Sequence, residues 1–154
     1  MKYKISKEVI PQDMREELNK KIEFIVNQNL SEEETGVTKE DIFNAYTGKG
    51  GLHGLKYKDF DNYARYQEAK SGIEQGQFFT PYPLVELIYT CLHISDTDLI
   101  ADLTSGHGAF ASCAPIESNF YGCEVDIPAY RVSRHLYPEA HITHTDIPDH
   151  LAWV

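Results

Sequence analysis

The chain has 154 residues, 42% of them apolar and 25% charged, which is enough for one sizeable core. The formal net charge is −10: residues 1–75 hold 12 Lys/Arg against 14 Asp/Glu, and residues 76–154 hold 2 against 10. Because affinity for nucleic acid depends on Lys and Arg that neutralise phosphates, this acidic half is excluded as a DNA-binding surface by itself. The charge does not exclude a small cationic ligand.

The cysteine content and the hydropathy of the sequence indicate the cellular compartment of the protein. The three cysteines form no CxxC pair and their number is odd, which argues against a disulfide framework or a structural zinc site. The opening MKYKISKEVI lacks the apolar run of a signal peptide, and no window approaches the roughly 20 apolar residues of a membrane span. The sequence therefore predicts a cytoplasmic protein with no membrane partner.

Residues 1–75 are predicted to form a helical N-terminal segment. Residues 12–28 carry one apolar stripe at spacings of three and four, formed by Met14, Leu18, Ile22 and Ile25. Thr38 and Asp41 form a capping box that opens a short helix. Residues 58–74 predict a further helix, with an aromatic stripe expected in the core and made of Phe60, Tyr63 and Tyr66.

Residues 76–154 alternate between helical and extended patterns. Thr80 is a candidate N-cap and Pro81 the first helical residue of a helix ending near Leu92, with an inner face of Leu84, Ile88 and Cys91. Beyond it the pattern predicts a strand, a helix limited to about two turns by Pro115, a second strand, a helix with Val132 and Leu136 facing inward, and a third strand. This order is typical of an α/β fold with a doubly wound parallel sheet, which binds ligands at the carboxyl ends of its strands.

An acidic residue ends each predicted strand: Asp102, Glu124 and Asp146 follow one another at intervals of 22 positions. They surround Ser105-Gly106-His107-Gly108, the glycine turn, whose glycines permit positive φ and close backbone approach to a ligand. If the sheet is parallel, all three carboxylates line one edge. Strand-end caps are the alternative explanation for each acid taken singly.

The segment GHGAFA also matches the dinucleotide pattern GxGxxG/A, which predicts a nicotinamide or flavin cofactor. The negative charge of Asp102 would then lie near a negatively charged pyrophosphate. No Lys or Arg occurs from Ser71 to Tyr130 to offset the charge of the phosphate oxygens. S-adenosylmethionine, which has a positive sulfonium and amino group and no phosphate, suits this acidic edge better. Glu124 is placed to accept hydrogen bonds from the ribose hydroxyls and Asp146 from the adenine amino group.

Four motifs together resemble the S-adenosylmethionine-binding part of adenine-N6 DNA methyltransferases: GQFFTP, DLTSGHGAF, GCEVD and TDI. More loosely, YTGKGGL resembles the lead-in of methylase-helicase proteins from phages and conjugative elements. The resemblance implies a Rossmann-like methyltransferase fold, here incomplete with about three parallel strands. It assigns the methionine part of the cofactor to Phe79, Thr80, Asp102, Gly106 and Gly108, the ribose to Glu124, and the adenine to Val125, Asp146 and Ile147.

The sequence lacks the N/D-P-P-Y/F motif with which this family holds the flipped target base. We therefore expect the cofactor-binding portion of a site-specific methyltransferase of the restriction-modification or mobile-element type, inactive by itself and meeting DNA only within a longer protein or with a partner subunit. No catalytic residue or metal ligand is predicted. The alternative is a non-catalytic binding module that acts through a partner protein, with homo-oligomers forming through the exposed edge of the third strand.

Overall fold

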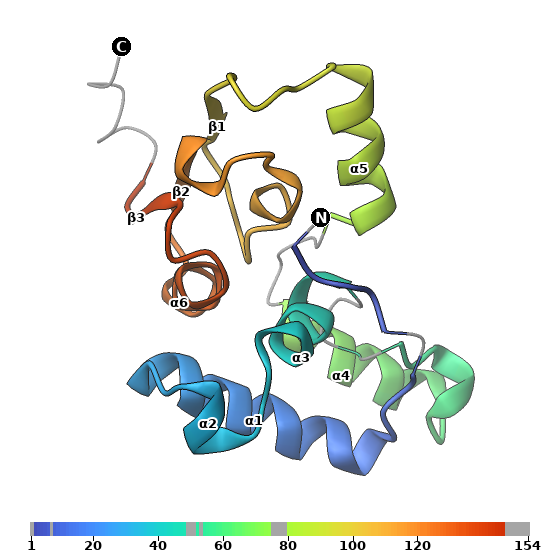
Figure 1. Cartoon of the computed structure of the whole chain (residues 1–154). Helices are drawn as coiled ribbons and strands as arrows, with labels where there is room; N and C mark the ends of the chain where they lie inside the picture. Colours follow the sequence, from blue (N-terminus) through green and yellow to red (C-terminus); the bar gives the residue numbers. More distant parts are fainter. Residues whose placement is uncertain (1, 7, 49–51, 53, 75–79, 147–154) are drawn as a thin grey trace. The chain divides into compact units, whose positions relative to one another are not determined.

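The computed structural model describes residues 2–6, 8–48, 52, 54–74 and 80–146 (Figure 1). The chain divides into two compact units, Lys4–Pro81 and a second unit that combines Met1–Tyr3 with Tyr82–Val154. We call them the helical unit and the sheet unit. In the described part of the chain, no helix is long and apolar enough to cross a membrane.

Helix α1, Gln12–Gln28, has the bounds that the periodicity predicts. Ile22 and Ile25 are fully buried, whereas Met14, at the N-terminal end of the predicted stripe, is 58% exposed. The helix ends at Asn29, whose left-handed conformation and N–H bond to the Ile25 carbonyl close the last turn. The C-terminal half of the stripe therefore provides the buried contact.

Two short helices follow, α2 (Glu32–Thr35) and α3 (Lys39–Phe43). The predicted capping box of α3 is confirmed: Asp41 N–H donates to the Thr38 hydroxyl, and Thr38 N–H donates to the Asp41 carboxylate. A π-helical turn, Asn44–Gly48, continues α3. The Asn44 amide bonds the backbone of both Lys4 and Ser6, so it anchors the start of this unit.

Helix α4, Tyr63–Glu74, begins five residues later than the predicted 58 because Asn62 caps it, accepting the Arg65 N–H at 3.0 Å. The preceding residues form a 3-10 turn, Tyr57–Asp59. Tyr63 is 62% exposed, so the prediction that this aromatic stripe lies in the core is wrong for Tyr63. Its ring instead lies beside that of Tyr66 on the surface of the helix, with ring centroids 5.9 Å apart.

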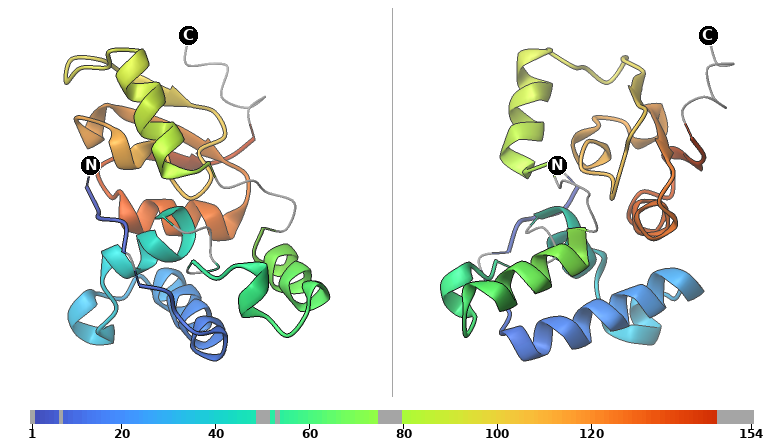
Figure 2. Two further views of the ribbon diagram at one scale, coloured as in Figure 1. Left: turned by 90° about the vertical axis from the view of Figure 1, so that its right-hand side faces the viewer. Right: turned by 180° about the vertical axis from the view of Figure 1, so that it is seen from behind.

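The sheet unit contains three parallel strands in the order β1-β2-β3: Ile100–Asp102, Phe120–Glu124 and His141–His144. Helix α5 (Tyr82–Cys91) precedes β1, and α6 (Ile127–Leu136) connects β2 to β3. The left panel of Figure 2 shows α5 in front of the strands and α6 below them. The α/β class and the three-stranded parallel sheet predicted from the alternation are confirmed.

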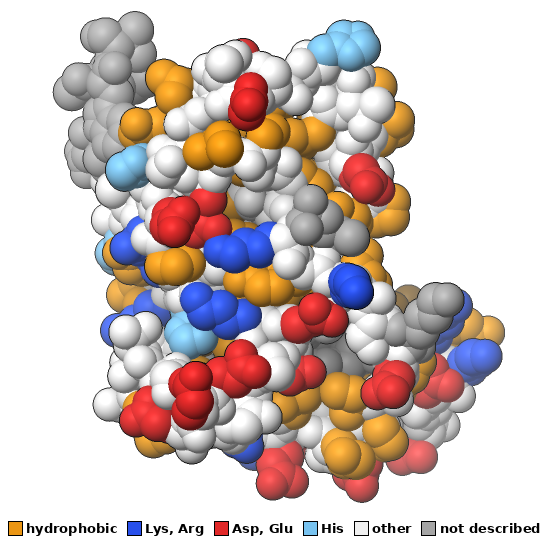
Figure 3. Space-filling model, viewed as in Figure 1, with side chains coloured by type: hydrophobic (Ala, Val, Ile, Leu, Met, Phe, Trp, Pro, Cys, Tyr) orange, Lys and Arg blue, Asp and Glu red, His pale blue; other side chains and the backbone are white. Residues whose placement is uncertain are grey.

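Helix α5 begins at Tyr82, one residue later than predicted, and buries a different face. Tyr82, Val85 and Tyr89 are buried, whereas Leu84 is 47% exposed and Cys91 is also exposed. The Tyr89 hydroxyl donates to the Phe110 carbonyl at 2.8 Å, so the aromatic residues decide which face turns inward. Hydrophobic side chains consequently gather along the outer side of α5 (Figure 3).

The two-turn helix expected after β1 does not form. In its place the chain makes two 3-10 turns, Ala111–Cys113 and Glu117–Asn119. Ala114 already has ψ 124°, because the residue before Pro115 is sterically excluded from the α region. The proline therefore stops the helix earlier than the sequence pattern predicts.

Helix α6 starts at an Asp126 N-cap, whose carboxylate accepts the Ala129 N–H at 2.9 Å. Val132 and Leu136 are buried as predicted, and the helix packs against β2 and β3. Because one face of α6 is apolar and contacts two strands, it covers one side of the sheet.

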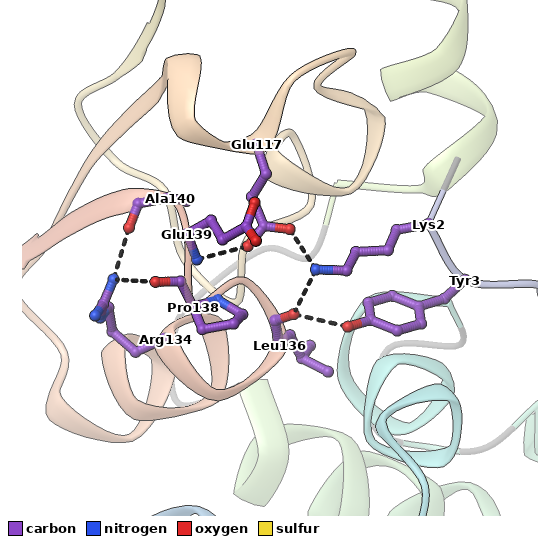
Figure 4. Close-up of polar contacts among 8 residues, drawn as sticks. All are labelled: Lys2, Tyr3, Glu117, Arg134, Leu136, Pro138, Glu139 and Ala140. Carbon is purple, nitrogen blue, oxygen red and sulfur yellow. Dashed lines mark hydrogen bonds and ion pairs between the residues drawn. The ribbon is translucent and has the colours of Figure 1, made fainter.

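The first residues of the chain pack within the sheet unit (Figure 4). Lys2 forms an ion pair with Glu117, and the buried Tyr3 hydroxyl donates to the Leu136 carbonyl at 2.7 Å. The Tyr3 ring lies against Tyr137, with centroids 5.9 Å apart. A segment more than 100 residues away in sequence thus closes the C-terminal end of α6.

Candidate functional site

The strand register explains how the three acidic residues are arranged. Asp102 pairs with Gly122 and Glu124 pairs with His144, so each acid lies two residues beyond the level of the preceding one. An even offset keeps side chains on one face of a sheet, and two residues correspond to about 6.6 Å along a strand. The equal sequence spacing therefore produces a staggered row along the carboxyl edge.

Glu124 ties β2 to the glycine turn. Its carboxylate accepts the Gly106 N–H on Oε2 at 2.6 Å and the Asp126 N–H on Oε1 at 2.7 Å, and the residue is only 9% exposed. Hydrogen bonds from backbone N–H groups to a carboxylate are charge-assisted and strong. Glu124 thus holds the turn and the start of α6 at fixed positions relative to β2.

The glycine turn has further anchors to β2. Both the N–H and the hydroxyl of Ser105 donate to the Cys123 carbonyl, at 2.9 and 3.1 Å. Gly106 and Gly108 have φ of +53° and +83°, the left-handed region predicted from the sequence. The turn is therefore held by its own backbone and by the Ser105 hydroxyl, for which the sequence analysis predicted no separate role.

Asp102 lies at the end of β1, where its carboxylate accepts the Thr104 N–H at 3.1 Å. Burial raises the pKa of this carboxyl, the bond from Thr104 lowers it, and the nearby charge of Glu124 raises it further. The strand register places Glu124 on the same face of the sheet as Asp102, two residues beyond it on the neighbouring strand. The structure therefore brings these two acids together beside the turn.

His107, between the two glycines, is half-buried. Burial lowers the pKa of its imidazole to about 4, and the charge of Asp126 counteracts this effect only in part. The ring is therefore neutral at pH 7. It adds no positive charge to the acidic edge.

The remaining predicted contacts lie around the end of β3. Asp146 is exposed two residues beyond the strand, and Val125, directly after Glu124, is 64% exposed. Thr145 N–H donates to the Glu124 carbonyl at 3.0 Å, which brings the segment before Asp146 to the end of β2. Thr80 is half-buried ahead of α5, and Phe79 and Ile147 lie outside the described residues.

Tyr137 is a residue of this region that the sequence analysis missed. Its ring lies directly under Gly108, where an added Cβ would come within 2.6 Å of Cε2. A glycine preceding a buried aromatic by about 30 positions carries no recognisable signal, because the contact exists only in the folded chain. The requirement for glycine at position 108 is therefore partly steric.

Among the described residues, no group of three or more His, Cys, Asp or Glu side chains is arranged so that it could hold a metal ion. His141 and His144 lie on opposite faces of β3, as their spacing predicts. The His141 ring stacks on Tyr121 at 4.7 Å, whereas His144 lies 5.5 Å from the Tyr130 ring of α6.

Comparisons with protein-family models, with curated proteins and with solved structures gave no match to this chain.

Proposed function

We propose that the carboxyl edge of the sheet binds S-adenosylmethionine, and that the chain is the cofactor-binding portion of a site-specific adenine-N6 DNA methyltransferase. The observation that carries the proposal is the position of Asp102 and Glu124 on the same face of neighbouring strands, beside a glycine turn that Glu124 holds through the Gly106 N–H. The four motifs that resemble that enzyme family support it.

Charge favours a cationic ligand over a phosphate. Asp102 and Glu124 lie on the same face of neighbouring strands, and burial first, then the charge of Glu124, raise the pKa of the Asp102 carboxyl against the opposing effect of the Thr104 N–H. A positive sulfonium or amino group placed beside them would stabilise both ionised forms. A pyrophosphate at the same place would add to the repulsion, which argues against a dinucleotide cofactor.

Glu124 retains acceptor capacity for a sugar. An ionised carboxylate offers about four lone-pair sites, and the two backbone N–H groups use one on each oxygen. The remaining sites can accept hydrogen bonds from two ribose hydroxyls without disturbing the turn. In this proposal Glu124 both positions the turn and holds the ribose, while Val125 and Asp146 lie toward the adenine.

DNA enters the proposal only through another segment or subunit. The chain has no N/D-P-P-Y/F motif, so the groups that hold a flipped adenine belong to that other segment. We therefore expect cofactor binding without methyl transfer from this chain by itself.

Calorimetric titration of the full chain with S-adenosylmethionine tests the proposal. We expect micromolar affinity, weakened about tenfold or more in Asp102→Asn and in Glu124→Gln, because each loses a charge beside the cation. Asp96→Asn, which neutralises an exposed acid in the loop before β1, is the matched control and should bind as the natural sequence does.

Two outcomes would contradict the proposal. Natural affinity in both Asp102→Asn and Glu124→Gln would show that the site lies elsewhere. Binding of reduced nicotinamide dinucleotide in place of S-adenosylmethionine would favour the oxidoreductase interpretation. Circular dichroism of each variant establishes that lost heat reflects lost binding and not lost structure.

A further inference from the structure

The ring of Tyr137 packs against the glycine turn at Gly108. A Cβ added to Gly108 would lie 2.6 and 2.8 Å from two carbons of that ring, so the ring fills the space beside the turn. Tyr137 is 0% exposed, and its buried hydroxyl has no hydrogen-bond partner among the described residues. Buried tyrosine hydroxyls usually find a partner. The position of this ring therefore depends on packing and not on a hydrogen bond of its own side chain.

Packing against Tyr137 joins the glycine turn to the C-terminal end of α6. On the side of β2 the turn is fixed by hydrogen bonds, among them the one from the Gly106 N–H to Glu124. At Gly108, the nearest atoms that an added Cβ would meet belong to Tyr137 and Ser133, at the end of α6. Side chains in such close contact limit how far the backbone can move, because protein interiors contain few voids. Loss of the ring would therefore leave the turn less restrained at Gly108.

Lys2 and Tyr3, which we call the N-terminal clamp, lie against Tyr137 and the residue before it. The Tyr3 ring packs against the Tyr137 ring with centroids 5.9 Å apart, and the Tyr3 hydroxyl donates to the Leu136 carbonyl at 2.7 Å. Lys2 Nζ lies 3.5 Å from the same carbonyl and 5.8 Å from the centre of the Tyr137 ring (Figure 4). The clamp therefore restrains Tyr137 through its ring and through the backbone beside it.

The clamp also bonds to the segment that follows the glycine turn. Lys2 N–H donates to the Ser112 carbonyl at 3.4 Å, and Ser112 N–H in turn donates to the Gly108 carbonyl at 3.1 Å. Lys2 forms an ion pair with Glu117, whose other carboxylate oxygen accepts the Glu139 N–H at 2.8 Å. The Glu117 side chain is only 12% exposed, and charge-assisted bonds of this kind are strong. The clamp thus connects the segment after the turn with the residues that follow α6.

We propose that the N-terminal clamp and Tyr137 are positioning residues of the candidate site, which hold the glycine turn in the conformation that a ligand meets. They act through Gly108 and do not contact the ligand. The inference deepens the proposed function and rests on it for the identity of the ligand, S-adenosylmethionine. A turn that is already ordered loses less conformational entropy on binding, so release of the clamp should weaken affinity.

Hydrogen exchange of the full chain without ligand tests whether these residues hold the turn. In Tyr137→Leu, we expect the Gly106 and Gly108 amides to exchange about tenfold faster relative to the amides of β3, because leucine leaves a void beside Gly108. In Tyr3→Leu, where the Tyr137 ring stays in place, we expect an increase of about threefold. Faster exchange throughout the sheet unit to the same degree would instead report a general loss of stability.

Calorimetric titration with S-adenosylmethionine measures the effect on the site. We expect affinity to fall about tenfold in Tyr137→Leu and about threefold in Tyr3→Leu. Tyr137→Phe keeps the ring and removes only the hydroxyl without a partner, so exchange of the turn and affinity should both stay within about twofold of the natural sequence. Tyr121→Leu is the matched control, because it removes a ring of β2 that stacks on His141, and it should also leave both within about twofold.

The proposal is overturned if exchange of the turn relative to β3 is natural in both leucine variants, or if Tyr137→Phe loses as much affinity as Tyr137→Leu. If circular dichroism shows that Tyr137→Leu does not fold, Tyr3→Leu decides by itself. Natural affinity for S-adenosylmethionine in a variant with a loosened turn would reject this inference alone. Absence of binding by the natural sequence would reject the proposed function, and the exchange measurements, which need no ligand, would still decide whether the clamp holds the turn.

Discussion

Gly108 lies directly against the ring of Tyr137: a Cβ at position 108 would be 2.6 Å from Cε2 and 2.8 Å from Cδ2 of that ring. The same glycine has φ of +83°. Tyr137 is fully buried and in turn contacts Tyr3. The glycine turn of the proposed cofactor site therefore rests on a packed aromatic pair that includes the start of the chain.

Gly108→Ala should destabilise the sheet unit by about 2 to 5 kcal/mol, since left-handed strain adds about 1–2 kcal/mol to a backbone–ring overlap worth about 1–3 kcal/mol. Gly106→Ala is the control: its φ is +53°, but an added Cβ there meets nothing within 4 Å. It should cost only about 1 kcal/mol. Urea unfolding followed by circular dichroism measures both, and equal losses would contradict the steric argument.

Glu124→Gln should lower the free energy of unfolding by about 1 to 3 kcal/mol even without ligand. The amide presents one carbonyl oxygen, so either Gly106 or Asp126 loses the acceptor of its N–H group. Glu86→Gln, on the exposed side of α5, should change stability by less than about 0.5 kcal/mol. Hydrogen exchange adds a local readout, because the Gly106 or Asp126 amide should exchange faster in the Glu124 variant alone.

Tyr3→Phe should cost about 1 kcal/mol, the usual net worth of a buried hydrogen bond, since its hydroxyl donates to the Leu136 carbonyl. Burial, and then the charge of Glu117, raises the pKa of this phenol to about 12. The contribution of the neutral Tyr3 phenol to the free energy of unfolding is therefore complete below pH 10 and declines as pH rises toward 12. In a titration followed by ultraviolet absorbance, the Tyr3→Phe variant should show one fewer phenol that ionises at high pH than the natural sequence does. Tyr57→Phe, at a position 64% exposed, should not affect stability.

Acidification should destabilise the sheet unit through His107. Because burial lowers the pKa of this imidazole to about 4 from an ordinary 6.5, the unfolded chain binds more protons between these values. Stability should be complete above pH 6.5 and fall by up to about 3 kcal/mol as pH approaches 4, at about 1.4 kcal/mol for each pH unit. His107→Gln should flatten this part of the profile, whereas His141→Gln, at an exposed site, should not. A parallel decline in both variants would assign the effect to other groups.

Local signals in the sequence predicted the elements whose stability is local. The periodicity of residues 12–28 and the Thr38–Asp41 capping box correspond to α1 and α3 as observed. The alternation of strands and helices predicted the parallel sheet. The inner face of α5 was mispredicted, because choosing between Leu84 and Tyr89 depends on what the helix meets, here the Phe110 carbonyl.

For the candidate site, the sequence by itself determined the chemical inventory: three strand-end acids at equal spacing, two glycines between them and no nearby cation. Only the tertiary structure decided how these act. It staggered the acids through the strand register and bonded Glu124 to Gly106. The physical reason is distance along the chain, because residues 18 or more positions apart interact only after parallel strands have paired.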